Sequence, residues 1–146
     1  MTEKSDKPDC QRSGAAAPRL FHYQLPGGWE VLAGRTDTDN DRLSLKLAAP
    51  DDLWFHVCGM PGSHVILRAR PDQRPDRETV RRAAAIAAFH SKAREGGTVA
   101  VSCTEARHVS KPRGAKPGTV TIRRERIIRV RPALPPDATE PTPCSS

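Results

Sequence analysis

Only one segment of this chain has the length and pattern of a long α-helix, and the rest consists of short apolar runs separated by turn signals. The helical segment spans residues 77–95, with Asp76 as its N-cap and Gly96-Gly97 as its stop. Small residues, among them Ala83 and Ala87, share one of its faces and would let it pack closely on a sheet. One helix among many short strands is typical of an α+β domain.

Apolar runs between Gly- and Pro-rich turns predict the strands. Residues 21–25 and 29–34 flank Pro26-Gly27-Gly28, which predicts a hairpin. Further strands are expected at residues 53–58, 63–69, 98–104, 119–122 and 126–130. Asn40 is expected to cap a short helix that carries Leu43 and Leu47. The predicted fold class is therefore α+β, a mostly antiparallel sheet with one long helix packed on it, plus a short helix.

The length of 146 residues fits one domain. Hydrophobic residues make up 36% of the chain and aromatic residues 4%, so a core can form only if the ends of the chain stay outside it. Residues 1–18 are predicted to be a disordered N-terminal tail and residues 19–131 the folded domain. Residues 132–146 contain five prolines and are predicted to be a Pro-rich disordered C-terminal tail.

No apolar run is long enough to span a membrane or to act as a secretory signal, so a cytoplasmic protein without a membrane partner is expected. The four cysteines include no C-x-x-C pair, which argues against a zinc ribbon. Cys58 and Cys103 lie in apolar runs and are expected to be buried, reduced thiols. The prediction includes no metal and no other cofactor.

The positive charge is concentrated in one part of the chain. Residues 107–131 hold nine Lys and Arg residues and only one acid, Glu125, which makes this segment +8 in a chain whose formal net charge is +7. The rest of the chain therefore has a formal net charge of −1. A solvated cationic face could have this composition, but the concentration favours a polyanionic partner such as nucleic acid or a membrane surface.

Two Lys-Pro pairs define a basic loop at residues 111–118. Each proline stiffens the backbone, and the glycines let the loop turn and expose N–H groups. Lys111, Arg113 and Lys116 would project from this semi-rigid loop. A phosphate backbone requires charge and donors at a regular spacing, so the loop is interpreted as a phosphate contact.

His56 lies in one predicted strand, and Ser63 and His64 begin the next, so pairing of these strands would bring them together. We expect a polar pocket whose imidazoles are hydrogen-bonded structural groups, with ligand contact as the second interpretation. Acid–base catalysis is a third, with Asp52 orienting a histidine. Asp41 is a further hydrogen-bond partner for the pocket, and Asn40 lies beside it. Arg35 either pairs with Asp41 or contacts phosphate.

The ordered set of motifs closely resembles the NFACT-R domain family. The matching segments are Gly34-Arg35, Asn40-Asp41 with Leu43, Asp52-Leu53-Trp54-Phe55-His56-Val57, Pro61-Gly62-Ser63-His64-Val65, the helix from Ala83 to Arg94, and Val109 to Val120 with its Lys-Pro-Arg-Gly-Ala-Lys-Pro-Gly core. The resemblance covers residues 21–130. Residues 119–122 and 126–130 could pair as a closing hairpin across Arg123-Arg124-Glu125. Compared with the family pattern this hairpin is unusually rich in arginine, and Arg123 and Arg124 would strengthen phosphate binding there.

The resemblance implies a stand-alone RNA-binding module of bacterial type. Larger members of the family bind the large ribosomal subunit and tRNA in ribosome quality control, so structured RNA, tRNA or rRNA, is the expected partner, in that process or elsewhere in RNA metabolism. Few aromatic residues are available to stack on bases, which predicts weak sequence preference. The alternatives are an RNA-processing or RNA-modifying enzyme that uses His56 and His64, and a protein-interaction module that docks on the ribosome. Oligomeric state is left open.

Overall fold

The structure is a computed structural model that describes residues 20–135 and 142–144. The predicted N-terminal tail, residues 1–18, lies outside the described residues. Of the predicted C-terminal tail, residues 136–141 and 145–146 also lie outside them.

One antiparallel sheet forms the centre of the molecule, as the turn pattern predicted. Its strands follow the spatial order β8-β5-β3-β4-β2-β1-β9. Their bounds are β1 (Leu20–Leu25), β2 (Trp29–Gly34), β3 (Leu53–Val57), β4 (Val65–Leu67), β5 (Val99–Glu105), β8 (Arg126–Val130) and β9 (Thr142–Cys144). Two short strands, β6 (Val109–Ser110) and β7 (Thr121–Ile122), pair separately as a small ribbon.

The predicted first hairpin is confirmed. β1 and β2 pair from Leu20 opposite Gly34 to Leu25 opposite Trp29. Gly27 and Gly28 have φ angles of 89° and 82°, a region that side chains with a Cβ rarely adopt, so the turn depends on them.

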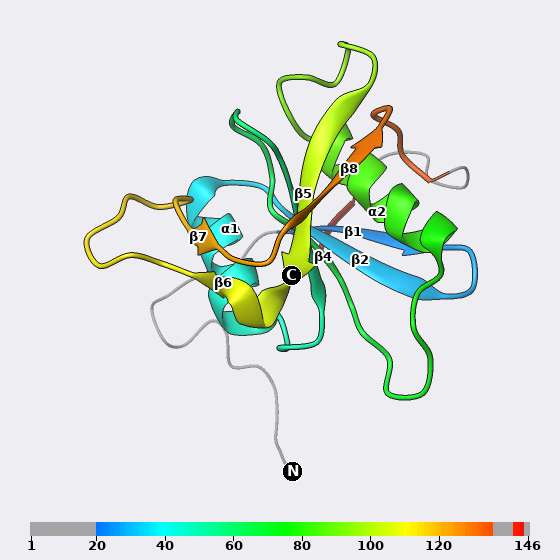
Figure 1. Ribbon diagram of the computed structural model, residues 1–146, viewed down its shortest axis with the longest axis horizontal. Coiled ribbons are helices and arrows are strands. Elements are labelled where there is room, and N and C mark those ends of the chain that lie inside the picture. The colour runs from blue at the N-terminus through cyan, green and yellow to red at the C-terminus, as the bar shows by residue number, and fades with distance from the viewer. Residues whose placement is uncertain (1–19, 136–141, 145–146) are drawn as a thin grey trace.

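Helix α2 (Arg77–Phe89) covers one face of the sheet. Asp76 caps it as predicted, because its carboxylate accepts the N–H of Thr79 at 2.8 Å. The small face of the helix packs against fully buried strand residues such as Phe55 and Val101. This arrangement confirms the α+β class. Figure 1 shows α2 on one side of the sheet and α1 with the β6–β7 ribbon on the other.

The predicted length of this helix is wrong, because α2 has 13 residues and ends at Phe89. The Ser91 hydroxyl donates to the carbonyl of Ala88 at 2.7 Å and accepts the N–H of Ala93 at 3.1 Å. Such side-chain bonds compete with the helical ladder. Ser91 also forms a β-bridge with Gly62, which draws the chain away from the helix axis.

The opposite face of the sheet is covered by α1 (Asp37–Arg42), by the π-helical turn η2 (Leu43–Leu47) and by the β6–β7 ribbon. Its apolar contacts join Trp54 and Ile66 of the sheet to Leu43 and Val109. The short helix was predicted, but its cap was not Asn40. Thr36 is the N-cap, since its hydroxyl accepts the N–H of Asp39 at 3.1 Å.

Part of the predicted C-terminal tail contacts the domain. The N–H of Ala133 donates to the carbonyl of Ala85 at 3.2 Å, and Leu134 packs against the core beside α2. β9 pairs with β1 at the edge of the sheet. Within the described ranges, no helix combines the length and apolar character needed to cross a membrane.

Candidate nucleic-acid interface

The basic loop at residues 111–118 connects β6 to β7 and projects from the molecule (Figure 1). Its base is fixed by the pairing of Val109 with Ile122 and of Ser110 with Thr121. Val109 is buried in the second core cluster, and Ile122 packs against that cluster. A packed base and two prolines therefore hold an otherwise exposed loop in place.

Asp41 braces the loop from helix α1. One carboxylate oxygen accepts the N–H of Gly118 at 3.0 Å, and the other lies 3.1 Å from the ammonium nitrogen of Lys111. The same ammonium donates to the carbonyl of Lys116 at 2.6 Å. Lys111, predicted to contact phosphate, is thus committed to contacts within the protein, and its charge is offset by Asp41.

Arg113 and Lys116 are the loop cations that face solvent. Among the described residues, no carboxylate forms an ion pair with either side chain. An exposed cation on a braced loop loses little conformational entropy when it binds a phosphate. These two residues therefore meet the physical requirements of a phosphate contact.

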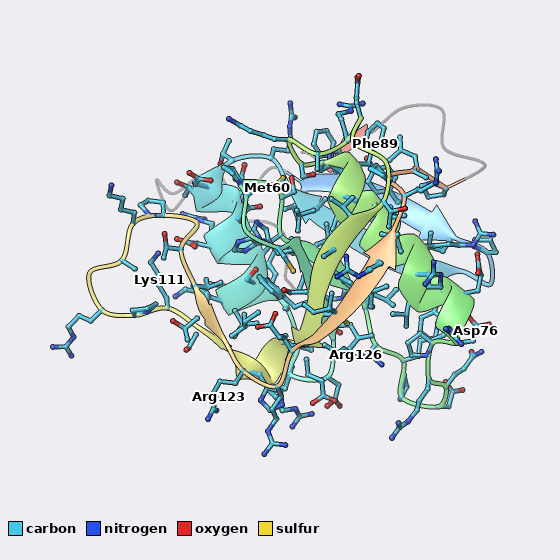
Figure 2. The ribbon with its side chains drawn as sticks, turned by 45° about the horizontal axis from the view of Figure 1, so that its top comes forward. Met60, Asp76, Phe89, Lys111, Arg123 and Arg126 are labelled. Atoms are coloured by element: carbon cyan, nitrogen blue, oxygen red, sulfur yellow. The ribbon has the colours of Figure 1, made fainter. Side chains whose placement is uncertain are left out.

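The other predicted cations lie elsewhere. Arg123 and Arg124 follow β7 at the end of the ribbon opposite the loop, and the labels of Lys111 and Arg123 are accordingly well apart in Figure 2. The carbonyl of Arg123 accepts the hydroxyl of Thr104 at 2.7 Å, which ties this turn to β5. Arg35 is on the β2–α1 connection, with its guanidinium 5.0 Å from the ring centre of Phe21. The six predicted RNA-binding residues thus fall in three places rather than one cluster.

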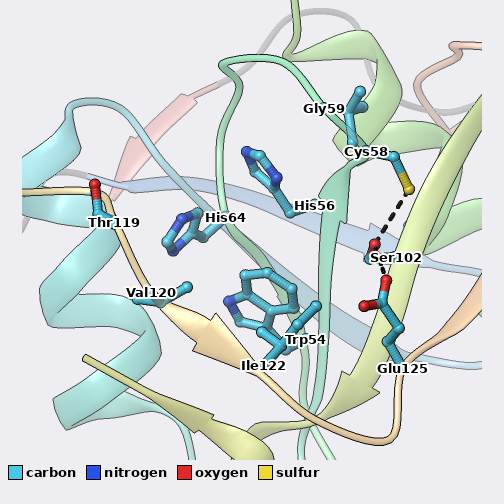
Figure 3. Close-up of a pocket in the computed structure, with 12 residues that line it drawn as sticks. Trp54, His56, Cys58, Gly59, His64, Ser102, Thr119, Val120, Ile122 and Glu125 are labelled. Atoms are coloured by element: carbon cyan, nitrogen blue, oxygen red, sulfur yellow. Dashed lines mark hydrogen bonds between the residues drawn. The ribbon is translucent and has the colours of Figure 1, made fainter. Parts of the chain in front are cut away.

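A cavity of about 360 Å³ lies between the sheet and the segment that leaves the basic loop. Figure 3 shows Trp54, His56 and Ser102 on the sheet side, with Thr119, Val120 and Ile122 across from them. The full lining comprises Trp54, His56, Val57, Cys58, Gly59, His64, Ser102, Gly118, Thr119, Val120, Ile122 and Glu125.

His56 and His64 meet in this cavity, as predicted from the pairing of their strands. Their rings are edge to face, 5.3 Å between centroids. The Ser44 hydroxyl is 2.8 Å from Nδ1 of His64 and accepts the indole N–H of Trp54 at 2.8 Å. Burial, with a further contribution from His56, lowers the pKa of His64 to about 4, and burial also lowers the pKa of His56. His64 is therefore uncharged near neutral pH.

Four predicted pocket residues are not part of the cavity lining. Asp52 lies at the other end of β3, where its carboxylate accepts the N–H groups of Ala49 and Ala69 at 2.8 and 2.7 Å. This corrects its predicted place beside a histidine, and acid–base catalysis loses its orienting carboxylate. Ser63 donates to the carbonyl of Gly34 at 2.6 Å.

Asn40 and Asp41 are the other two, and both have structural contacts. The Asn40 side-chain carbonyl accepts the N–H of His64 at 3.0 Å, which joins α1 to β4. Asp41 braces the basic loop. The predicted alternative that Arg35 pairs with Asp41 is not realised, because the cation beside Asp41 is Lys111.

A row of polar groups in the cavity was not predicted. The Ser102 hydroxyl donates to the carboxylate of Glu125 at 2.6 Å, and the Cys58 thiol is 3.2 Å from the same hydroxyl. Alternation along residues 98–104 could have indicated Ser102, since it lies opposite the apolar face of Val99 and Val101. Within the described part of the chain, no three His, Cys, Asp or Glu side chains are grouped so that they could hold a metal ion.

Comparison with known proteins gives consistent results. The chain is 42% identical over 115 residues to the Rqc2 homolog RqcH of Bacillus subtilis, and 42% identical over 102 residues to that of Streptococcus suis. These matches cover 79% and 70% of the chain but only 20% and 18% of the relatives, so the chain spans about a fifth of their length.

A solved structure, the C-terminal part of the fibronectin/fibrinogen-binding protein from Streptococcus suis, has the same fold. The TM-score is 0.74 at 36% identity, over 87% of this chain and 51% of that one. The family described as the NFACT protein RNA binding domain matches residues 19–124, which is most of the chain. On these grounds the chain belongs to the NFACT-R family.

Proposed function

We propose that residues 19–131 form a domain that binds structured RNA, tRNA or rRNA, in ribosome quality control. Membership of a family described by RNA binding supports the proposal, as does the similarity to RqcH proteins. The large ribosomal subunit is the proposed source of the rRNA.

The braced loop carries the proposal. Asp41 holds the loop through a hydrogen bond from Gly118 and an ion pair with Lys111. The loop presents the exposed side chains of Arg113 and Lys116. Phosphate contacts supply most of the affinity of sequence-independent RNA binding. Arg123 and Arg124 would add a second contact at the far end of the ribbon.

The cavity beneath the loop is proposed to receive a neutral part of the RNA, such as a ribose hydroxyl. Its histidines can donate and accept hydrogen bonds without carrying charge, because burial lowers their pKa. Glu125 in the lining would repel a phosphate. This division leaves phosphate recognition to the loop.

Reversing the charge of both exposed loop cations tests the proposal. We expect the double variant Arg113→Glu, Lys116→Glu to bind tRNA or rRNA fragments roughly tenfold or more weakly than the parent. The slope of log affinity against log salt should fall by about two, one for each phosphate that the variant no longer neutralises. Lys111 is left in place, because its replacement would also disturb the loop.

The matched control is Arg74→Glu, Arg77→Glu, which changes the charge equally at two exposed positions flanking Asp76. Figure 2 places Asp76 on the opposite side of the molecule from Lys111. Equal decreases in affinity in both double variants would indicate a general charge effect, and an unchanged affinity in the loop variant would exclude this loop as the site.

A further inference from the structure

A second cavity, of about 420 Å³, lies where the end of α2 meets β1 and the β2–α1 connection. It shares no lining residue with the cavity that contains His56 and His64. Rings and cations gather in its lining: Phe21, Arg35, Phe89, His90, Lys92 and Arg94.

The rings of this cavity form an ordered stack. Phe21 and His90 are nearly parallel, with centroids 4.7 Å apart and planes at 11°. Phe89 meets the ring of His90 edge to face, with centroids 5.4 Å apart. A guanidinium covers each end of the set, that of Arg35 5.0 Å from the centre of Phe21 and that of Arg94 3.9 Å from the centre of Phe89.

The imidazole of His90, the central ring of the stack, is held in position and is uncharged. The hydroxyl of Tyr23, which is buried, is 2.6 Å from Nε2 of His90. Burial, aided by the nearby charge of Arg94, lowers the pKa of His90 to about 4. The platform is thus preorganised before any ligand binds, which reduces the entropy cost of binding.

The cations around the stack are available for a ligand. Among the described residues, no carboxylate pairs with Arg35, Lys92 or Arg94, and all three are exposed. By contrast, Arg107 pairs with Asp51 and Glu105. Asp37 is the one carboxylate of the lining, so the cavity keeps a net positive charge.

Flat rings, planar guanidinium groups and unpaired positive charge suit a ligand that is both planar and anionic. An unpaired nucleotide has both properties, since its base stacks on aromatic or guanidinium planes and its phosphate binds a cation. A base in a helix has both faces covered by its neighbours and does not fit this description.

The cavity adjoins the basic loop. Asp37 lines the cavity, and a Cβ on Gly118 would lie 2.9 Å from its carboxylate. The two surfaces therefore meet at the start of α1, and one RNA could contact both. We propose that this cavity holds an unpaired nucleotide of the bound RNA, with its base stacked on the outer face of the Arg35 or the Arg94 guanidinium and with Lys92 on a phosphate. The proposal rests on the proposed RNA binding.

The test compares two RNA hairpins, one with purines in its loop and one with abasic sugars in their place. Because stacking of one base contributes a clear share of affinity, the parent chain should bind the purine loop about tenfold more tightly. The variant Arg35→Lys, Arg94→Lys keeps both charges and removes both planes. It should lose most of this preference and bind the abasic hairpin as well as the parent does.

The matched control is Arg74→Lys, Arg77→Lys, at exposed positions by the opposite end of α2; it should keep the preference. 2-Aminopurine in the hairpin loop gives a second readout, since its fluorescence should be quenched by the parent and much less by the Arg35→Lys, Arg94→Lys variant. Equal affinity of the parent for the two hairpins would overturn the nucleotide site alone. Failure to bind either hairpin would overturn the RNA-binding proposal as well.

Discussion

Gly118, like Lys111, contacts helix α1 from the basic loop. Its φ angle is 87°, and its N–H donates to Asp41. A Cβ at this position would approach the side chain of Asp37 at 2.9 Å. Glycine is required here for two separate reasons, a left-handed backbone and a close contact.

Replacing Gly118 by alanine separates those reasons when it is compared with Gly114→Ala. Gly114 has a similar φ of 79° but has nothing within 4 Å of its missing Cβ. Both variants carry the backbone penalty of about 1 kcal/mol, and Gly118→Ala should also shift the loop. We expect a larger decrease in RNA affinity and in thermal stability for Gly118→Ala, measured by titration and by calorimetry. Equal decreases would contradict the importance of the contact with Asp37.

At the scale of elements, the β6–β7 ribbon depends on a helix far away in the sequence. Asp41, in α1, accepts a hydrogen bond from Gly118 and forms an ion pair with Lys111, both in the loop between the two strands. The ribbon contributes only small apolar contacts of its own to the second core cluster. The order of the loop therefore depends on the carboxylate of Asp41 as well as on the packed base and the prolines.

Asp41→Asn tests this dependence. The amide can still accept from Gly118 but no longer attracts the ammonium of Lys111, so the loop should become more mobile. We expect faster amide hydrogen exchange at Gly118 and several-fold weaker RNA binding, with a global stability decrease of about 1 kcal/mol or less, because partly exposed ion pairs contribute little. Asp51→Asn, which alters the exposed partner of Arg107, is the control and should leave exchange in the loop unchanged. Unaltered exchange in Asp41→Asn would show that the prolines and the strands suffice.

At the scale of the whole molecule, buried histidines link folding to pH. His64 is 2% exposed, and burial brings its pKa to about 4 in the folded state from an ordinary value of 6.5. Between these values the unfolded chain binds the proton and the folded chain does not. The free energy of unfolding should therefore fall as pH decreases from about 6.5 towards 4.

Urea unfolding at pH 7, 6 and 5 measures this effect. Between pH 6.5 and 4, His64 alone can lower the free energy of unfolding by up to about 3 kcal/mol. His90, whose pKa is lowered in the same direction, adds to this decrease. His64→Gln should reduce the slope of stability against pH, even if it lowers stability throughout. A slope that is identical in the parent and in His64→Gln would assign the pH dependence to other groups.

Local signals in the sequence determined strands β1 to β5, β7 and β8, the first hairpin, the cap at Asp76 and the family. They did not indicate β6 or β9, and the expected closing hairpin is wrong, because β7 pairs with β6 and β8 pairs with β5. Turn residues, alternation and capping act between neighbours in the chain, so they can be seen without a fold. The pairing of β3 with β4 then followed, and with it the meeting of His56 and His64.

Only the tertiary structure decided where α2 ends, what Lys111 contacts and where Asp52 lies. Each depends on a partner that the fold brings near: Gly62 for Ser91, Asp41 for Lys111, and the N–H of Ala69 for Asp52. The stack of Phe21, Phe89 and His90 likewise joins β1 to the end of α2. Contacts between distant segments are chosen by packing and by the satisfaction of buried polar groups, and no short stretch of sequence contains them.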